Sequence, residues 1–239
     1  MNHKDATTFY KAYKTILELL TDRGLRIIDE GVVHPISFRE FQSSPPTVFQ
    51  VEKDNGLVDR DGEQSLNDPI RKYRGNNLQF VVFLYGEFRV ASKENFTDQL
   101  FTEIYAKYGQ SLLETREERF VKNKHKDLMK KLGKILVIYS SPAKNNPQEY
   151  TEYLKDDFDQ VEFHEAHHTV FNPTKHAYQP KFTLLNNKEA RRVRDLYGGT
   201  NLQIITKNDR INRWYGGVLG DIYLIRRKNG QVNYRYVIN

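Results

Sequence analysis

Two patterns of apolar residues alternate along the chain, one typical of helices and the other of buried strands. Helical spacing marks the opening segment, where the apolar positions are Phe9, Tyr10, Tyr13, Ile16, Leu17, Leu19 and Leu20. This spacing predicts a helix of about four turns, with Thr7 or Thr8 as its N-cap and Gly24 just after its end. Apolar runs predict buried strands at residues 78–84 and 134–139, and strands are also predicted at 25–28 and 160–164.

Helical patterns lie between these predicted strands. They indicate a short helical turn at 38–41, one or two helices at 96–132 and another helix at 147–154. The polar stretch 52–77, which contains several Gly and Pro residues, is predicted to be a long loop or an insertion. Because helices alternate with apolar strands and no tandem repeat is present, we expect an α/β fold for the first part of the chain.

The C-terminal third has a different pattern. A charged helix is predicted at 187–196, with Lys188, Arg191, Arg192 and Arg194 on its exposed face. Near the end, a glycine-rich turn is predicted at Arg213-Trp214-Tyr215-Gly216-Gly217. Two β-rich runs follow at 221–226 and 232–238, joined by Lys228-Asn229-Gly230, which predicts a terminal β-hairpin. The boundary between two domains is expected near Ala166, which gives domains of residues 1–166 and 167–239.

Composition narrows the chemistry that the chain can perform. There is no cysteine, which excludes disulfides, thiolate metal sites and cysteine nucleophiles. No apolar stretch approaches the roughly 20 residues needed to span a bilayer, so we expect a soluble, intracellular protein without membrane contact. His164, His167, His168 and His176 form the only group with metal-like content, and neither Cys nor a suitably spaced carboxylate completes a zinc set. We therefore expect structural histidines, no metal and no cofactor.

Charge is distributed unevenly between the two predicted domains. Residues 167–239 carry 13 Lys and Arg against 4 Asp and Glu, a net charge of +9, whereas residues 1–166 carry 24 against 27, a net charge of −3. A basic region of this kind binds nucleic acid or an acidic protein surface, and it can also simply keep the protein soluble. The sequence does not choose between these partners.

The order of several short motifs resembles one family, that of RNA polymerase subunit 5, a small subunit that the eukaryotic nuclear polymerases share and that has an archaeal counterpart. The motifs that carry the resemblance are Asp22-Arg23-Gly24, Ser141-Pro142-Ala143, His167-His168, Asn208-Asp209, Tyr215-Gly216, Gly220-Asp221-Ile222, Ile225-Arg226 and Tyr234-Arg235. The chain departs from the family pattern in four places: residues 52–77 and 94–119 look longer than the family needs, Thr169 to Gln179 separates His168 from Pro180-Lys181, and Phe182 stands where His is common.

The resemblance implies a fold and a function. The fold would be an α/β jaw domain, similar to a truncated restriction endonuclease, followed by a small α+β assembly domain that ends in a β-hairpin. The chain would be one copy of a non-catalytic subunit in a hetero-oligomeric DNA-directed RNA polymerase, a nucleotidyltransferase complex. It would dock on the largest subunit, contact other subunits and lie near downstream duplex DNA. It would be nuclear if cellular, and in the virion or host cytoplasm if a large DNA virus encodes it.

Candidate residues follow from this resemblance. The docking candidates are Arg191, Arg192, Arg213, Trp214, Tyr215, Gly216, Gly217, Asp221, Arg226, Tyr234 and Arg235. The candidates for DNA contact are Ser140, Ser141, Pro142 and Lys144, whose hydroxyl, backbone N–H and ammonium groups can hold a duplex without reading its bases.

Two other classes of function stay open as alternatives. A free-standing nucleic-acid-binding protein would use the basic third directly, with an affinity that falls steeply as salt rises. A metal-dependent nuclease would need an acidic residue two positions before a Lys on one strand. No Asp or Glu of the chain has Lys at that position, so we expect no catalytic residues.

Overall fold

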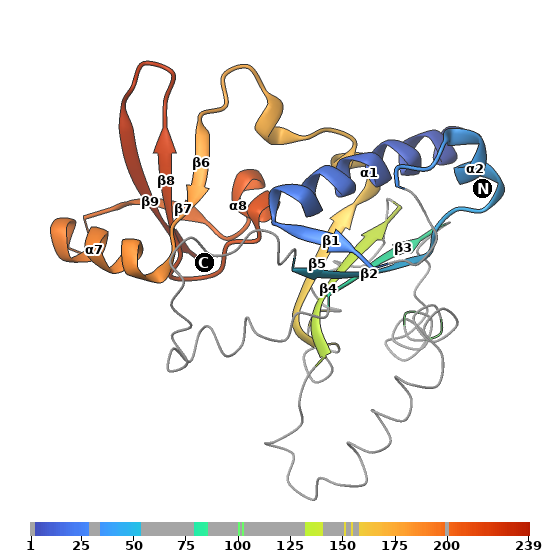
Figure 1. The fold of residues 1–239 in the computed structure, drawn as a ribbon, viewed down its shortest axis with the longest axis horizontal. Coiled ribbons are helices and arrows are strands. Elements are labelled where there is room, and N and C mark those ends of the chain that lie inside the picture. The colour runs from blue at the N-terminus through green and yellow to red at the C-terminus, as the bar shows by residue number, and fades with distance from the viewer. Residues whose placement is uncertain are drawn as a thin grey trace, which may run out of the picture. The chain divides into compact units, whose positions relative to one another are not determined.

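The structure is a computed structural model, and it describes residues 3–28, 34–53, 79–85, 100, 102, 132–140, 151, 154, 158–198 and 201–239. The chain forms two compact units (Figure 1). The N-terminal unit consists of Met1–Leu17 and Gly24–Val170, and the C-terminal unit consists of Glu18–Arg23 and Phe171–Asn239. Each unit is described by itself.

A five-stranded sheet forms the centre of the N-terminal unit. Its strands, in the order β1-β2-β3-β4-β5, are β1 (Leu25–Ile27), β2 (Val48–Lys53), β3 (Gln79–Leu84), β4 (Leu132–Tyr139) and β5 (Phe158–Glu165). The β1-β2 and β2-β3 pairs are antiparallel, whereas β3-β4 and β4-β5 are parallel. The sheet is therefore mixed. Its parallel strands β3 and β4 are continuous apolar runs, as expected for strands covered on both faces.

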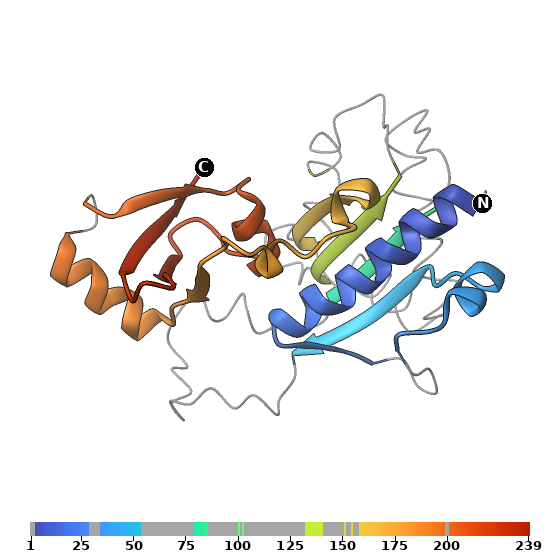
Figure 2. The same cartoon turned by 90° about the horizontal axis from the view of Figure 1, so that it is seen from above.

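One long helix, α1 (His3–Asp22), covers one face of this sheet (Figure 2). Its buried side chains recur at helical spacing and are Ala6, Phe9, Ala12, Tyr13, Ile16, Leu19 and Leu20. Next to it lies the short helix α2 (Phe38–Ser43), which starts with a capping box made by Ser37 and Glu40. Aromatic rings from α1, α2, β2 and β3 pack together, and Tyr13 lies at their centre with no exposed surface.

The predictions for this unit are confirmed for several elements and wrong in detail for others. The four predicted strands are present, and Gly24 has a left-handed φ of 68° after α1. The predicted N-cap is wrong, because α1 already begins at His3 and the Thr8 hydroxyl donates to the carbonyl of Lys4 inside the helix. Strand β2 was not predicted, and it includes residues 52 and 53, which the sequence assigned to a loop. Most of the segment 52–77 and nearly all of 96–132 and 147–154 lie outside the described residues.

The C-terminal unit is built on a four-stranded sheet with the order β6-β8-β9-β7. Its elements are η3 (Pro173–Lys175), β6 (Lys181–Leu184), α7 (Asn187–Tyr197), β7 (Gln203–Thr206), α8 (Arg210–Tyr215), β8 (Ile222–Arg226) and β9 (Val232–Ile238). A one-turn helix of the N-terminal unit, η2 (Ala166–Thr169), precedes them in the chain. β8 and β9 form the predicted antiparallel hairpin, in which Gly230 has a φ of 82°. Strand β7 joins β9 in parallel, and β6 joins β8 antiparallel.

Side chains alternate between the two faces of this sheet, and each face has its own helix. On the α8 face, Ile211 packs with Phe182, Ile205, Tyr223, Ile225 and Val237. On the α7 face, Ala190 and Val193 pack with Leu185 and Ile222. The two small cores are therefore separated by the sheet itself.

One prediction for this unit needs correction. Trp214 and Tyr215 are predicted to lie in a turn, but they belong to α8, which Asp209 caps by accepting from the N–H groups of Ile211 and Asn212. The predicted terminal hairpin is confirmed, and β6 and β7 extend it on both sides. The predicted helix at 187–196 is confirmed as α7, with a capping box between Asn186 and Glu189. Within the described residues, no helix is both long enough and apolar enough to cross a membrane.

Candidate docking site

Two motifs that lie far apart in the sequence meet at the end of α8. The indole Nε1 of Trp214 donates to the Asp22 carboxylate at 2.8 Å, and Arg23 Nε donates to the carbonyl of Trp214 at 2.8 Å. A second guanidinium nitrogen of Arg23 donates to the carbonyl of Arg213. The last carbonyls of a helix have no partner within it and carry partial negative charge. Arg23 satisfies two of them at the end of α8.

The glycines after α8 allow this arrangement. Gly216 has a left-handed φ of 66°, and a Cβ there would lie 3.0 Å from the Arg23 guanidinium carbon. A Cβ on Gly217 would lie 2.3 Å from both Asn212 Oδ1 and the Tyr223 hydroxyl oxygen. Both positions therefore exclude side chains, so these glycines serve the packing of the unit.

A buried polar group stabilises the same region. The side-chain amide of Asn212 donates to the carbonyls of Lys207 and Gly217, and its Oδ1 accepts from the Tyr223 hydroxyl at 2.9 Å. Asn212 is 1% exposed and Tyr223 is fully buried, so every polar group here needs a protein partner. Burial raises the pKa of Tyr223 far above its ordinary value. Tyr223 is therefore a neutral donor at physiological pH.

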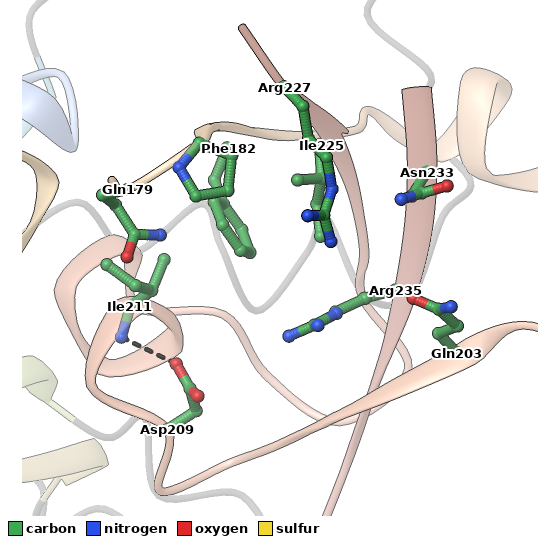
Figure 3. Close-up of a pocket in the computed structure, with 10 residues that line it drawn as sticks. Gln179, Phe182, Gln203, Asp209, Ile211, Ile225, Arg227, Asn233 and Arg235 are labelled. Carbon is green, nitrogen blue, oxygen red and sulfur yellow. Dashed lines mark hydrogen bonds between the residues drawn. The ribbon is translucent and has the colours of Figure 1, made fainter. Parts of the chain in front are cut away.

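The α8 face is only partly covered by its helix, and a pocket of about 230 Å³ opens beside α8 (Figure 3). Its lining comes from all four strands, from α8 with its N-cap, and from the segment before β6: Gln179, Pro180, Phe182, Gln203, Asp209, Ile211, Ile225, Arg227, Asn233 and Arg235. Figure 3 shows the Arg227 side chain beside Ile225 and the Arg235 side chain pointing toward Ile211 and Asp209. The pocket thus combines an apolar floor with two guanidinium groups.

The α7 face differs, because apolar side chains remain exposed around its helix. Leu196 is 78% exposed, Tyr197 is 51% exposed and Ile204 of β7 is 59% exposed. Ile204 pairs with Tyr236, and the ring of Tyr197 lies 5.6 Å from that of Tyr234. We call Leu196, Tyr197, Ile204, Tyr234 and Tyr236 the α7 apolar group.

Basic side chains lie on the same helix and the same sheet face. Arg191 and Arg192 are exposed on α7, and Arg194 stacks over Tyr236 with its guanidinium carbon 5.8 Å from the ring centroid. Arg226 is exposed on β8, directly opposite Val232. An apolar centre with arginines around it is a common composition for a protein interface.

The structure distributes the predicted docking residues over several environments. Arg191, Arg192, Arg213 and Arg226 are exposed, and Tyr215, Gly216, Asp221, Tyr234 and Arg235 are half-buried. Trp214, at 4% exposed, and Gly217 are buried. The Asp221 carboxylate accepts from the N–H of Val218 at 2.9 Å. The buried members hold the unit together, so only the exposed and half-buried ones offer contact surface.

The candidates for DNA contact lie almost entirely outside the described residues. Ser140 is half-buried directly after β4, whereas Ser141, Pro142 and Lys144 are not described.

His168 Nδ1 lies 3.3 Å from a Glu165 carboxylate oxygen. Across the described ranges, no three His, Asp or Glu side chains gather closely enough to hold a metal ion.

Comparison with protein families resolves which fold the C-terminal unit has. Residues 171–237 match the family model of the RNA polymerase Rpb5 C-terminal domain. This part of the chain is therefore similar to the Rpb5 C-terminal domain. The match covers η3, both helices and all four strands of the C-terminal sheet. The α+β fold expected for this part of the chain is therefore confirmed, and the family indicates an RNA polymerase subunit. The comparison with curated proteins found no match to this chain.

Sequence reasoning missed two features of this Rpb5 C-terminal domain. The first is the pocket residue Arg227, which directly follows the motif Ile225-Arg226 and was not considered. Strand alternation could have identified it, because Arg227 follows Ile225 by two positions and so faces the α8 side. The second is the pairing of Asp22 and Arg23 with α8, for which the only signal was the presence of both motifs in one family pattern.

Proposed function

We propose that this Rpb5-family chain is a non-catalytic subunit of a multisubunit DNA-directed RNA polymerase and that its C-terminal unit docks on the largest subunit. The family match over residues 171–237 carries this proposal. Assembly with other polymerase subunits follows from family membership. The identity of the docking partner is part of the proposal.

The α7 apolar group supports docking through this unit. Exposed aromatic and aliphatic side chains gain free energy when a partner excludes water from them, at about 25 cal/mol per Å². The net charge of +9 on residues 167–239 adds a preference for an acidic partner surface. Arg191, Arg192 and Arg226 lie where they can supply this electrostatic complementarity.

The N-terminal domain would form part of the lower jaw near downstream duplex DNA. Residues 1–166 have a net charge of −3, so any DNA contact must be local. The segment from Ser140 to Lys144 begins at the carboxyl end of strand β4 and is the candidate for phosphate contact. The subunit would be found in the nucleus, or in the virion or host cytoplasm if a virus encodes it.

Affinity purification of the tagged full chain from its native source tests the proposal. Mass spectrometry at moderate salt should find two very large polymerase subunits in stoichiometric amounts. Recovery of nucleic acid alone, lost as the salt concentration rises, would replace the proposal with a free-standing nucleic-acid-binding protein.

The DNA contact needs a separate test within the purified polymerase. Lys144→Glu should weaken crosslinking of this subunit to downstream duplex DNA and leave co-purification unchanged, because it reverses one charge at a phosphate contact. Undiminished crosslinking would remove residues 140–144 from the DNA path.

A further inference from the structure

We propose that the pocket on the α8 face binds a carboxylate of a partner polypeptide, an Asp or Glu side chain next to an apolar residue. This inference deepens the proposed docking function and rests on it, because the partner segment would belong to the polymerase. Arg227 and Arg235 are the residues that would hold the carboxylate.

The two arginines converge on one space although they come from different positions of the hairpin. Arg235 lies within β9, opposite Tyr223 of β8 and beside Gln203 of β7. Arg227 directly follows β8. Figure 3 shows the Arg235 side chain pointing toward the side where Ile211 and Asp209 lie, and the Arg227 side chain running beside Ile225 toward Arg235. A planar carboxylate in that space could receive hydrogen bonds from both guanidinium groups.

Neither guanidinium group has an acidic partner among the residues that the structure describes. Arg235 Nε is buried and makes no hydrogen bond there. A buried donor without an acceptor destabilises the folded state, because it has given up its hydrogen bonds to water. The site therefore contains an unsatisfied hydrogen-bond donor, Arg235 Nε, and a bound carboxylate would supply its acceptor.

Asp209 is the one acidic residue in the pocket lining, and its carboxylate is already engaged. It accepts from the backbone N–H of Ile211 at 2.8 Å as the N-cap of α8. Two arginines against one carboxylate leave the lining with a net charge of +1. Like charges that share a partly enclosed site repel each other, and a second anion there relieves this repulsion.

The floor of the pocket decides in favour of a polypeptide over a nucleic-acid phosphate. Phe182, Ile211 and Ile225 supply apolar surface, and Pro180 adds to it at the rim. A phosphate diester gains nothing from such a floor, whereas an aliphatic or aromatic side chain next to Asp or Glu would bury itself there. The volume of about 230 Å³ limits the occupant to one or two side chains.

Titration of the isolated full-length chain tests the pocket without any polymerase. The probe is the blocked dipeptide N-acetyl-Leu-Glu-amide, followed by NMR of the arginine Nε–H signals and of the backbone amides. Arg227 and Arg235 should shift together with Phe182 and Ile225. The matched dipeptide N-acetyl-Leu-Gln-amide should shift them at least tenfold less at equal concentration. Inorganic phosphate is the third probe.

Variants assign the response to the pocket. Arg227→Gln should weaken binding of the Glu dipeptide at least fivefold, and it changes an exposed side chain that the fold does not need. Arg235→Gln should have a larger effect but also alters β9. Arg226→Gln is the matched control, because it removes the same charge one residue away and on the opposite face of the sheet. It should leave the titration unchanged.

Three results would overturn the inference. The first is equal binding of the Glu and Gln dipeptides. The second is stronger binding of phosphate at the same arginines, which would indicate a nucleic-acid site. The third is the absence of any shift in the signals of Arg227 and Arg235. Co-purification separates these results from the proposed function. If the wild-type chain recovers the polymerase subunits but the Glu dipeptide does not bind, the pocket inference fails alone. If the dipeptide binds and no polymerase subunit is recovered, the proposed function fails alone.

Discussion

The two faces of the C-terminal sheet use the same strands for different purposes. On the α8 face, a six-residue helix closes over a core in which Asn212, Gly217 and Tyr223 fit without spare room. On the α7 face, the buried residues of the longer helix are Ala190 and Val193, and Leu196, Tyr197 and Ile204 of the α7 apolar group stay exposed. The difference indicates that the α8 face determines the stability of the fold and that the α7 face is available for contact. The pocket beside α8 is the exception on the closed face.

This comparison predicts its largest effect at Gly217. A Cβ placed there would lie 2.3 Å from two oxygen atoms, so Gly217→Ala requires the buried Asn212 and Tyr223 to move. Overpacking of this kind costs about 3 kcal/mol. Urea unfolding of the full chain, followed by circular dichroism, should show this loss in the transition of the C-terminal unit.

Gly230 provides the control for that substitution. Unlike Gly217, it has a positive φ, of 82°, and nothing lies within 4 Å of its Cβ position. Gly230→Ala should therefore cost only the conformational strain of about 1 kcal/mol. Equal losses for the two variants would mean that the close contacts at Gly217 cost no more than the backbone strain at Gly230.

The second effect in size concerns the buried hydroxyl of Tyr223. Tyr223→Phe leaves Asn212 Oδ1 without its donor in a site closed to water, which costs about 2 kcal/mol. Tyr234→Phe is the matched change on the α7 face, where the ring is half-buried, and it should change stability by less than about 0.5 kcal/mol. Thermal unfolding of both variants checks the contrast, and a similar shift in both would break it.

A smaller effect is expected at the junction of Asp22 with Trp214. Asp22→Ala leaves the buried indole N–H without its acceptor, a loss of about 1–2 kcal/mol. The substitution also removes a negative charge from the C-terminal end of α1, where the helix dipole makes it unfavourable by about 0.5 kcal/mol. The first effect is larger, so we expect a net loss of about 1 kcal/mol.

Trp214 fluorescence measures this junction directly. The Asp22→Ala variant should change the emission of the single tryptophan under native conditions, since the indole loses its hydrogen-bond acceptor. Lys11→Ala, an exposed substitution elsewhere on α1, serves as the control and should leave both the emission and the stability unchanged. An unchanged spectrum in Asp22→Ala would contradict the assignment of residues 18–23 to the C-terminal unit.

Much of this fold could be predicted where local pattern and tertiary environment agree. The apolar runs in β3 and β4, the amphipathic spacing of α1 and the glycine turn of the hairpin each specify their element locally. Strands β6 and β7 could not be predicted in this way. Each has only four residues, too few for a reliable period even though β6 alternates between exposed and buried positions, and their place depends on pairing with β8 and β9.

The candidate site was predictable only as a set of motifs. The family resemblance implies that Trp214 and Gly217 belong to a docking turn, yet both are buried by contacts with residues far away in the sequence, such as Asp22 and Tyr223. Arg226 and Arg227 are adjacent in the sequence, but the sheet directs them to opposite faces. Sequence motifs identify the family, whereas the strand register decides which residue of a motif is free to bind.

The smallest effect on stability, and a large one on assembly, is expected on the α7 face. Leu196→Gln keeps the length and the helix propensity of the side chain, and because Leu196 is 78% exposed, the free energy of unfolding should change by less than about 0.5 kcal/mol. If a polymerase subunit covers the α7 apolar group, the side-chain amide that Leu196→Gln introduces must give up its hydrogen bonds to water on docking. Binding of the chain to that subunit should then weaken at least tenfold, or about 1.4 kcal/mol. Co-purification with the polymerase, quantified by mass spectrometry, measures this loss.

Lys188→Gln, an exposed change at the other end of α7, should retain nearly full recovery. Full recovery of the Leu196→Gln variant would show that the partner does not cover this face, and the docking surface would then have to include the α8 face and its arginine pocket.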